Sequence, residues 1–114
     1  MSLTGRPVAQ KAPRNSDPEF LAAIRQLLCL ACGRAAPSEA HHVRSRGAYG
    51  GDDAWNVIPL CAQHHTLGKD AWHRIGPLLF LKRYPHVRGY LETLGWVFDG
   101  KRLYRPSVEQ TDGA

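Results

Sequence analysis

Four of the six histidines stand in two adjacent pairs, at the ends of a block that runs from residue 40 to residue 65. The pairs are His41-His42 and His64-His65. Histidine changes charge near neutral pH and is the commonest metal ligand. Because adjacent residues of a strand point to opposite faces, one ion could bind both His41 and His42 only if the strand were distorted. We therefore expect a division of labour, in which one holds a metal ion and the other faces a substrate as a base.

The three cysteines and His64 fall into two half-sites with the spacing of metal ligands, Cys29-x-x-Cys32 and Cys61-x-x-His64. A gap of two residues lets one tight turn present both side chains to one ion, and Cys3His is an accepted ligand set for structural zinc. The odd number of cysteines also favours metal binding over disulfides. We expect a structural zinc ion that clamps the two ends of the histidine block together. Three buried cysteines beside an unrelated histidine are the alternative.

The charge of the chain favours an anionic partner, because 15 Lys and Arg against 10 Asp and Glu give a net charge of +5. Nucleic acid is the usual partner of such a chain. Arg44 and Arg46 lie beside the first histidine pair, and the glycines of segment 46–53 would let the backbone approach a phosphate closely. We expect both arginines to contact DNA phosphates, with solvated loop charges as the alternative. Asp52 and Asp53 are expected to cap or brace this loop, with a role as metal ligands as the alternative.

A membrane partner is not expected, because the sequence contains no apolar run of the roughly 18 residues that a spanning helix needs. The first 15 residues also lack the apolar stretch of a secretory signal. These features predict a cytoplasmic protein.

Short strands framed by helices are expected around the histidine block. A first helix should run from a capping box of Ser16 and Glu19 to about Leu28, with its apolar residues on one face. Strands are expected at 39–43 and 57–60, on either side of the glycine-rich loop. Further elements are predicted as helices at 64–74, from Pro77 to 83 and at 85–94, and as a two-residue hairpin turn at Asp99-Gly100.

These elements predict one domain of the α+β class. Residues 16–106 should form the domain, with a structural zinc knuckle, flanking helices and a C-terminal β-hairpin. Residues 1–15 are expected to be a disordered basic arm, and residues 107–114 a flexible tail.

The histidine block resembles the HNH endonucleases. Three segments, AHHV at 40–43, WNVIPLC at 55–61 and QHH at 63–65, are similar to the ββα-metal motif of that family in residue type, order and spacing. The match covers about residues 29–74. The two knuckle half-sites around it resemble the zinc-ribbon HNH subgroup of small phage and prophage proteins. The resemblance implies a small ββα-metal core and a metal-dependent DNA endonuclease encoded by a bacterium, phage or prophage.

The family's functional roles pass to the residues that match its motif. His41 matches the first metal ligand, His42 the general base, and Asn56 the residue that holds the loop and orients the base. His65 matches the second metal ligand. His73 follows eight residues later on roughly the same helical face, and is a candidate for a third ligand or a phosphate contact. A surface or core histidine is the alternative, because family members often place the extra histidine closer to the second ligand.

The implied chemistry is hydrolysis of a phosphodiester bond by an activated water. A neutral His42 would take the proton of the water, while a divalent cation polarises the phosphate and stabilises the leaving oxygen. A site with two imidazole ligands should hold Mg²⁺ weakly and favour Mn²⁺, Ni²⁺ or Co²⁺. The sequence shows no separate recognition domain, so low sequence specificity is expected. The chain is expected to be a monomer or a weak dimer. One site per chain predicts nicking by a monomer, and double-strand cleavage would need a dimer or two sequential events.

Two other functions remain open. The chain could be a zinc-stapled module that binds nucleic acid without cutting it, although binding alone needs neither His42 nor Asn56. It could also be a nuclease subunit that is active only within a phage packaging or mobile-element complex.

Overall fold

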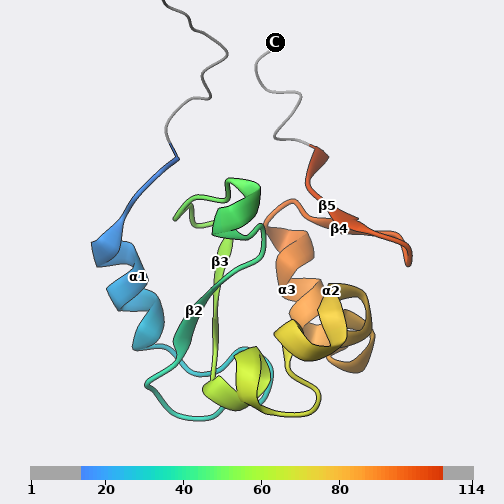
Figure 1. The fold of residues 1–114 in the computed structure, drawn as a ribbon, viewed down its shortest axis with the longest axis horizontal. Helices are drawn as coiled ribbons and strands as arrows, with labels where there is room; N and C mark the ends of the chain where they lie inside the picture. Colours follow the sequence, from blue (N-terminus) through green and yellow to red (C-terminus); the bar gives the residue numbers. More distant parts are fainter. Residues whose placement is uncertain (1–13, 107–114) are drawn as a thin grey trace, which may run out of the picture.

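The computed structural model describes residues 14–106. The predicted basic arm, except for its last two residues, and the predicted tail at 107–114 lie outside the described residues. In chain order the elements are α1 (Pro18–Arg25), β2 (Glu39–His42), η1 (Arg46–Ala48), β3 (Val57–Leu60), η2 (Gln63–Leu67), α2 (Trp72–Arg83), α3 (Pro85–Thr93), β4 (Val97–Phe98) and β5 (Leu103–Tyr104) (Figure 1). The expected mixture of helices and antiparallel strands is confirmed, with two two-stranded sheets, β2–β3 and β4–β5.

The β2–β3 pair carries the histidines and separates two groups of apolar side chains. His41 lies opposite Ile58, and His42 lies opposite Val57. Directly opposed residues of an antiparallel pair share one face of the sheet. Val57 packs with Leu21 of α1, whereas Ile58 belongs to the main core beside α2 and α3. The two adjacent histidines therefore face different sides of the strand, as expected.

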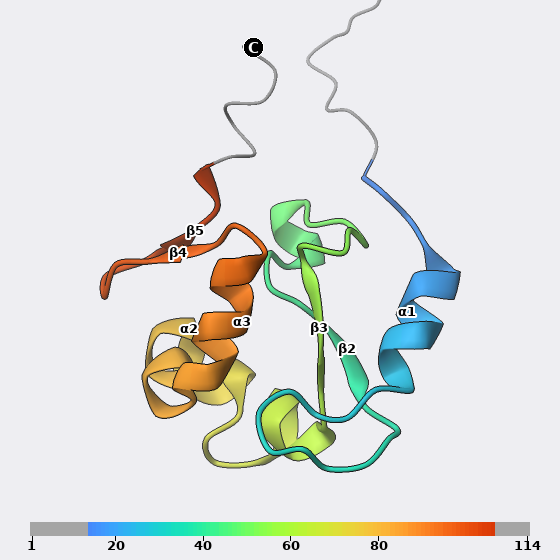
Figure 2. The ribbon, with the colours of Figure 1, turned by 180° about the vertical axis from the view of Figure 1, so that it is seen from behind.

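The main core lies between β3 and the α2–α3 pair, on the side of β3 that is opposite α1 (Figures 1 and 2). Its most deeply buried side chains are Ile58, Leu60, Phe80, Leu81, Val87 and Leu91. Burying each of these contributes roughly 1.5–3 kcal/mol. Trp96 and Phe98 of the C-terminal segment join this core. Among residues 14–106, no helix is long and apolar enough to cross a bilayer.

Helix α1 differs from the prediction at both ends. Its N-cap is Asp17 rather than Ser16, because the Asp17 carboxylate accepts a hydrogen bond from the Phe20 N–H at 3.0 Å. The helix ends at Arg25, where the chain tightens and the Leu27 N–H bonds the Ile24 carbonyl. Leu27 and Leu28 then leave the apolar face and are 50% and 60% exposed. This turn leads directly into the first cysteine half-site, which begins at Cys29.

The prediction of one continuous helix at 64–74 is wrong. The structure has a short π-helical turn, η2, and then extended backbone at Gly68 before α2 begins at Trp72. A Cβ at Gly68 would lie 2.5 Å from the Gln63 carbonyl oxygen, so this break requires glycine. Helix α2 changes direction at Gly76, which has φ of 86°, and its second half begins at Pro77 as predicted.

The C-terminal hairpin forms as predicted, but its turn is longer than two residues. Phe98 pairs with Leu103, so residues 99–102 join the two strands. The Asp99 carboxylate accepts hydrogen bonds from the N–H groups of Lys101 and Arg102, both at 2.9 Å. These bonds favour a wider loop over the tight turn at Asp99-Gly100 that the sequence suggests.

Candidate functional site

The predicted zinc ligands come together. One ligand atom from each of Cys29, Cys32, Cys61 and His64 lies within 4.8 Å of all the others. The Cys32 and Cys61 sulfurs are 3.9 Å apart, close to the spacing of about 3.8 Å that two sulfurs have around one tetrahedral zinc. This set of soft sulfur and imidazole donors can therefore bind a metal such as zinc.

Local turns build each half of this cluster. The Gly33 N–H bonds the Cys29 carbonyl at 2.8 Å, and Gly33 has φ of 78°, which favours glycine. On the other side, the His64 N–H bonds the Cys61 carbonyl at 3.0 Å. Burial raises the pKa of the Cys29 thiol, but hydrogen bonds from the backbone of Cys61, Cys32 and Ala31 hold that pKa below its ordinary value. Cys29 thus favours the thiolate that a metal requires, whereas burial and the neighbouring Cys29 raise the pKa of the Cys32 thiol.

The second cluster contains His41, His65 and His73, whose ligand atoms also lie within 4.8 Å of one another. They come from β2, η2 and the first turn of α2. His41 is 1% exposed, and neither of its ring nitrogens has a hydrogen-bond partner among the described residues. Burial, followed by the nearby His65 and His73, lowers the pKa of His41 well below its ordinary value. A neutral imidazole with an unshared lone pair therefore faces two other histidines.

Glu39 orients one member of this cluster, and the sequence analysis missed it. Its Oε1 lies 2.6 Å from Nδ1 of His65, which leaves Nε2 of His65 free to bind a metal. Carboxylates commonly hold metal-binding histidines in this way. Glu39 stands two residues before His41 on the same strand, so strand alternation placed both on one face. That periodicity was the available signal.

His42 faces the opposite side and contacts Asp52. The His42 Nε2 and the Asp52 Oδ1 are 2.7 Å apart, and the Asp52 side chain is 3% exposed. The other oxygen of Asp52 accepts the N–H of Asp17 at 2.8 Å. Burial raises the pKa of Asp52, but its bonds to His42 and to the Asp17 N–H, with the charge of Arg46, hold that pKa below its ordinary value. Asp52 braces the loop as expected, and it also holds His42.

Asn56 is fully buried and holds the loop closed. Its Oδ1 accepts the Arg44 N–H at 2.7 Å, while its Nδ2 donates to the carbonyls of Arg44 and Gly51 at 3.0 and 2.9 Å. A Cβ at Gly50 would lie 1.7 Å from the Arg44 carbonyl oxygen, so the closed loop also requires glycine there. The amide thus fixes the loop that carries Asp52, and Asp52 in turn contacts His42.

The two predicted DNA-contacting arginines differ in their surroundings. The Arg44 guanidinium lies over the Trp55 ring, 5.5 Å from its centre. Arg46 is exposed and lies 3.4 Å from the Asp52 carboxylate. Trp72 packs in the core and against the His41 ring at 4.3 Å between centres, consistent with a packing role.

Comparisons of the chain with protein-family models, with curated proteins and with solved structures found no match. The functional interpretation therefore rests on the chemistry of the two clusters and of the His42–Asp52 pair. Together these groups could hold two cations and accept a proton from a bound water.

Proposed function

We propose that the chain is a metal-dependent DNA endonuclease of the HNH type, which hydrolyses phosphodiester bonds with His42 as its general base. The observation that carries this proposal is His41, a buried imidazole without a hydrogen-bond partner among the described residues, beside His65 and His73. Leaving a buried polar group unpaired costs about 1–3 kcal/mol. A bound cation would remove that cost.

Three imidazoles would hold the cation. His41 and His65 are the expected ligands, and the third histidine of the cluster, His73, completes a set that leaves positions open to water and to phosphate oxygens. When bound, the cation would polarise the phosphate and stabilise the charge on the leaving oxygen. Imidazole ligands favour Mn²⁺, Co²⁺ or Ni²⁺ over Mg²⁺.

The proton is accepted by His42. His42 is the last residue of β2. A phosphodiester bound at this end of the strand can therefore contact the cation on one face of the strand and His42 on the other. With its Nε2 bonded to Asp52, Nδ1 of His42 accepts a proton from the attacking water. The oxygen of that water bonds to phosphorus as the bond from phosphorus to the leaving sugar oxygen breaks. The Asp52 carboxylate stabilises the resulting imidazolium.

A nicking assay on supercoiled plasmid tests this function. Loosely held cations are first removed by brief chelation, and each preparation is shown to retain its zinc. Adding Mn²⁺ should then restore nicking at least as well as Mg²⁺. Full nicking without any added divalent cation would contradict the mechanism.

Variants separate the enzyme from a protein that only binds nucleic acid. His42→Ala should lower the nicking rate by about 10²–10⁴-fold, the usual contribution of a general base, while DNA binding persists. His73→Ala should raise the Mn²⁺ concentration that is needed for half-maximal nicking. His86→Gln is the matched control, since His86 belongs to neither cluster and glutamine can keep its hydrogen bond to the Ala31 carbonyl. Undiminished cleavage by His42→Ala would rule out His42 as the base. If the isolated wild-type chain binds DNA without cutting it, a binding module or a subunit of a larger complex is the better description.

A further inference from the structure

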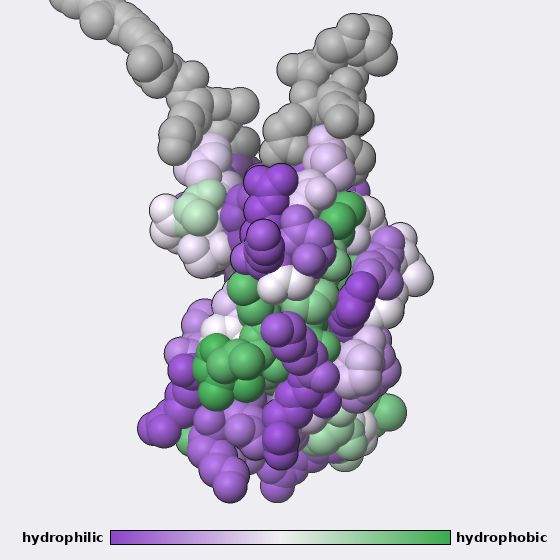
Figure 3. All heavy atoms as spheres, turned by 90° about the vertical axis from the view of Figure 1, so that its right-hand side faces the viewer, coloured by the Kyte–Doolittle hydropathy of each residue, from purple (hydrophilic) through white to green (hydrophobic). Residues whose placement is uncertain are grey.

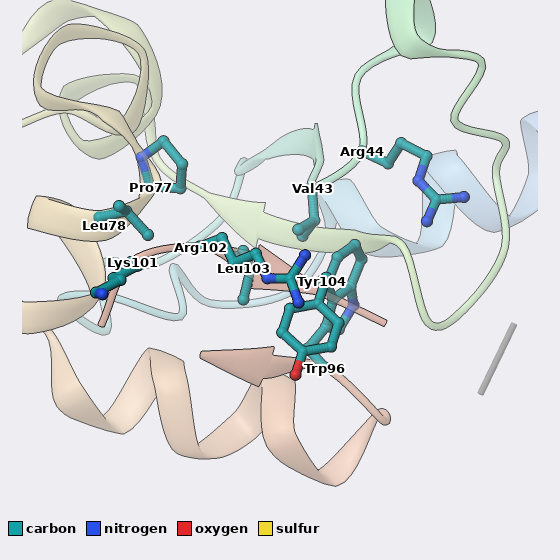
Figure 4. Close-up of a pocket in the computed structure, with 9 residues that line it drawn as sticks. All are labelled: Val43, Arg44, Pro77, Leu78, Trp96, Lys101, Arg102, Leu103 and Tyr104. Atoms are coloured by element: carbon teal, nitrogen blue, oxygen red, sulfur yellow. The ribbon is translucent and has the colours of Figure 1, made fainter. Parts of the chain in front are cut away.

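A cavity of about 380 Å³ opens between the end of β2, the second half of α2 and the C-terminal hairpin. Val43 and Arg44, which directly follow His42 in the chain, form one wall of it. Pro77 and Leu78 of α2 line another part, and the hairpin supplies the rest (Figure 4). We call this cavity the hairpin groove. It adjoins the strand end that carries the proposed base but shares no residue with either histidine-containing cluster.

The lining of the hairpin groove joins an apolar floor to a basic rim. Val43, Leu78 and Leu103 pack against the main core and present apolar surface. Arg44, Lys101 and Arg102 supply positive charge, and none of the described residues that line the groove carries a carboxylate. The nearest described acid on the hairpin is Asp99, whose carboxylate is 3.7 Å from Arg102. On the molecular face that α2, α3 and the hairpin form, apolar residues make a band bordered by hydrophilic ones (Figure 3).

Aromatic and guanidinium planes lie together in this groove. The Arg102 guanidinium is 4.2 Å from the centre of the Tyr104 ring. Trp96 also lines the groove and is mostly buried. Trp96 therefore belongs to the floor of the groove, whereas Tyr104 is partly exposed. A nucleobase can stack on Tyr104 or on the guanidinium plane of Arg102, and the cations beside them can contact phosphates.

The shape of the site decides which nucleic acid fits. A protein can bind the phosphate backbone of an intact duplex with cations on an open surface. The bases of that duplex are stacked inside the helix and cannot enter a cavity such as the hairpin groove. A hollow with an apolar floor and a cationic rim suits a nucleotide whose base is free. We propose that the hairpin groove binds an unpaired nucleotide of the DNA strand that is cut. This inference rests on the proposed nuclease function, and it predicts a preference for DNA with a single-stranded gap or flap at the cutting site.

A binding experiment tests the groove separately from catalysis. Full-length His42→Ala protein, without added divalent cation, is titrated by fluorescence anisotropy into a paired duplex and into the same duplex with a short single-stranded gap. The gapped DNA should bind about ten-fold more tightly, the scale of one stacked base. Adding Lys101→Ala and Arg102→Ala should abolish this preference. The slope of the logarithm of the binding constant against the logarithm of the salt concentration should also become shallower, by the amount expected for the loss of about two phosphate contacts.

The matched control removes the same charge elsewhere. Arg25→Ala with Lys82→Ala also loses two cations, and neither residue lines the groove. This variant should keep the preference for gapped DNA. Equal binding of the two DNAs by the parent protein, or equal effects of the two double variants, would overturn the proposal. Cleavage by the wild-type chain is measured in parallel with Mn²⁺. A preference for gapped DNA without cleavage would contradict only the nuclease function, and cleavage without that preference would contradict only the groove.

Discussion

His42 and Asp52 stand ten residues apart in the chain, and the Nε2 atom of the histidine lies 2.7 Å from the Oδ1 atom of the carboxylate. The second carboxylate oxygen accepts the N–H of Asp17, the N-cap of α1. The orientation of His42 therefore depends on a loop that is fastened both to Asn56 and to the first helix. This relationship connects the packing of α1 to the proposed chemistry.

The Asp52→Asn substitution tests that connection. Asparagine keeps an oxygen for the Asp17 N–H but loses the negative charge that stabilises a protonated His42. We expect kcat for nicking to fall by about 10²-fold, within the range of general-base effects, with little change in KM. Initial rates over a range of DNA concentrations measure both constants. Asp53→Asn is the control next in the chain. Equal losses in the two variants, or a change confined to KM, would contradict a positioning role for Asp52.

The free energy of unfolding should depend on pH because His41 is buried as a neutral imidazole. Its pKa is lowered well below the ordinary value of 6.5, mainly by burial. The unfolded chain therefore takes up a proton more readily than the folded one as the pH falls below 6.5. The contribution of neutral His41 to the free energy of unfolding is therefore complete above pH 6.5 and is lost as the pH falls below it. For one group, the free energy of unfolding changes by at most about 1.4 kcal/mol per pH unit.

Urea unfolding of the zinc-containing protein at several pH values above and below 6.5 measures this slope. His41→Leu should flatten it, since zinc release in acid affects both proteins alike. His86→Gln is the control, because glutamine can keep the hydrogen bond of His86 to the Ala31 carbonyl. Parallel curves for the wild type and His41→Leu would show that His41 titrates alike in the folded and unfolded chains.

Glu39 should act through His65 rather than on the substrate. Glu39→Gln weakens the 2.6 Å contact that orients the imidazole. Loss of such a partner typically reduces metal affinity by about 10–100-fold. Calorimetric titration with Mn²⁺ measures the affinity directly. Glu92→Gln, which removes a carboxylate from an exposed ion pair with Arg88, should leave it unchanged. An affinity that survives Glu39→Gln would show that His65 does not need this partner.

Removal of the Cys3His metal should unfold the domain. This cluster joins the segment after α1 to the start of η2, and binding of a structural zinc contributes directly to the free energy of folding. We expect one zinc per chain by elemental analysis and loss of the cooperative thermal transition after prolonged chelation. Cys61→Ser should have the same effect without chelator. A sharp transition in zinc-free protein would mean that the apolar core suffices.

Features that depend on neighbouring residues were predictable from the sequence. The two cysteine half-sites follow from ligands three positions apart, the strand at 57–60 from an apolar run, and the restart of α2 at Pro77 from the fixed backbone of proline. His73 illustrates the limit. It was expected beside His65 on one continuous helix, yet the chain is extended at Gly68 and His73 reaches the cluster from the start of a separate helix.

The sequence by itself determined the residue types of both clusters and the alternation that turns His41 and His42 to opposite faces, because turn geometry and strand period act over a few residues. Only the tertiary structure decided that Glu39 meets His65, that Asp52 meets His42, and that the hairpin closes a groove against α2. These contacts join residues 10 or more positions apart. Their formation depends on how the elements pack around the core, which no local pattern specifies.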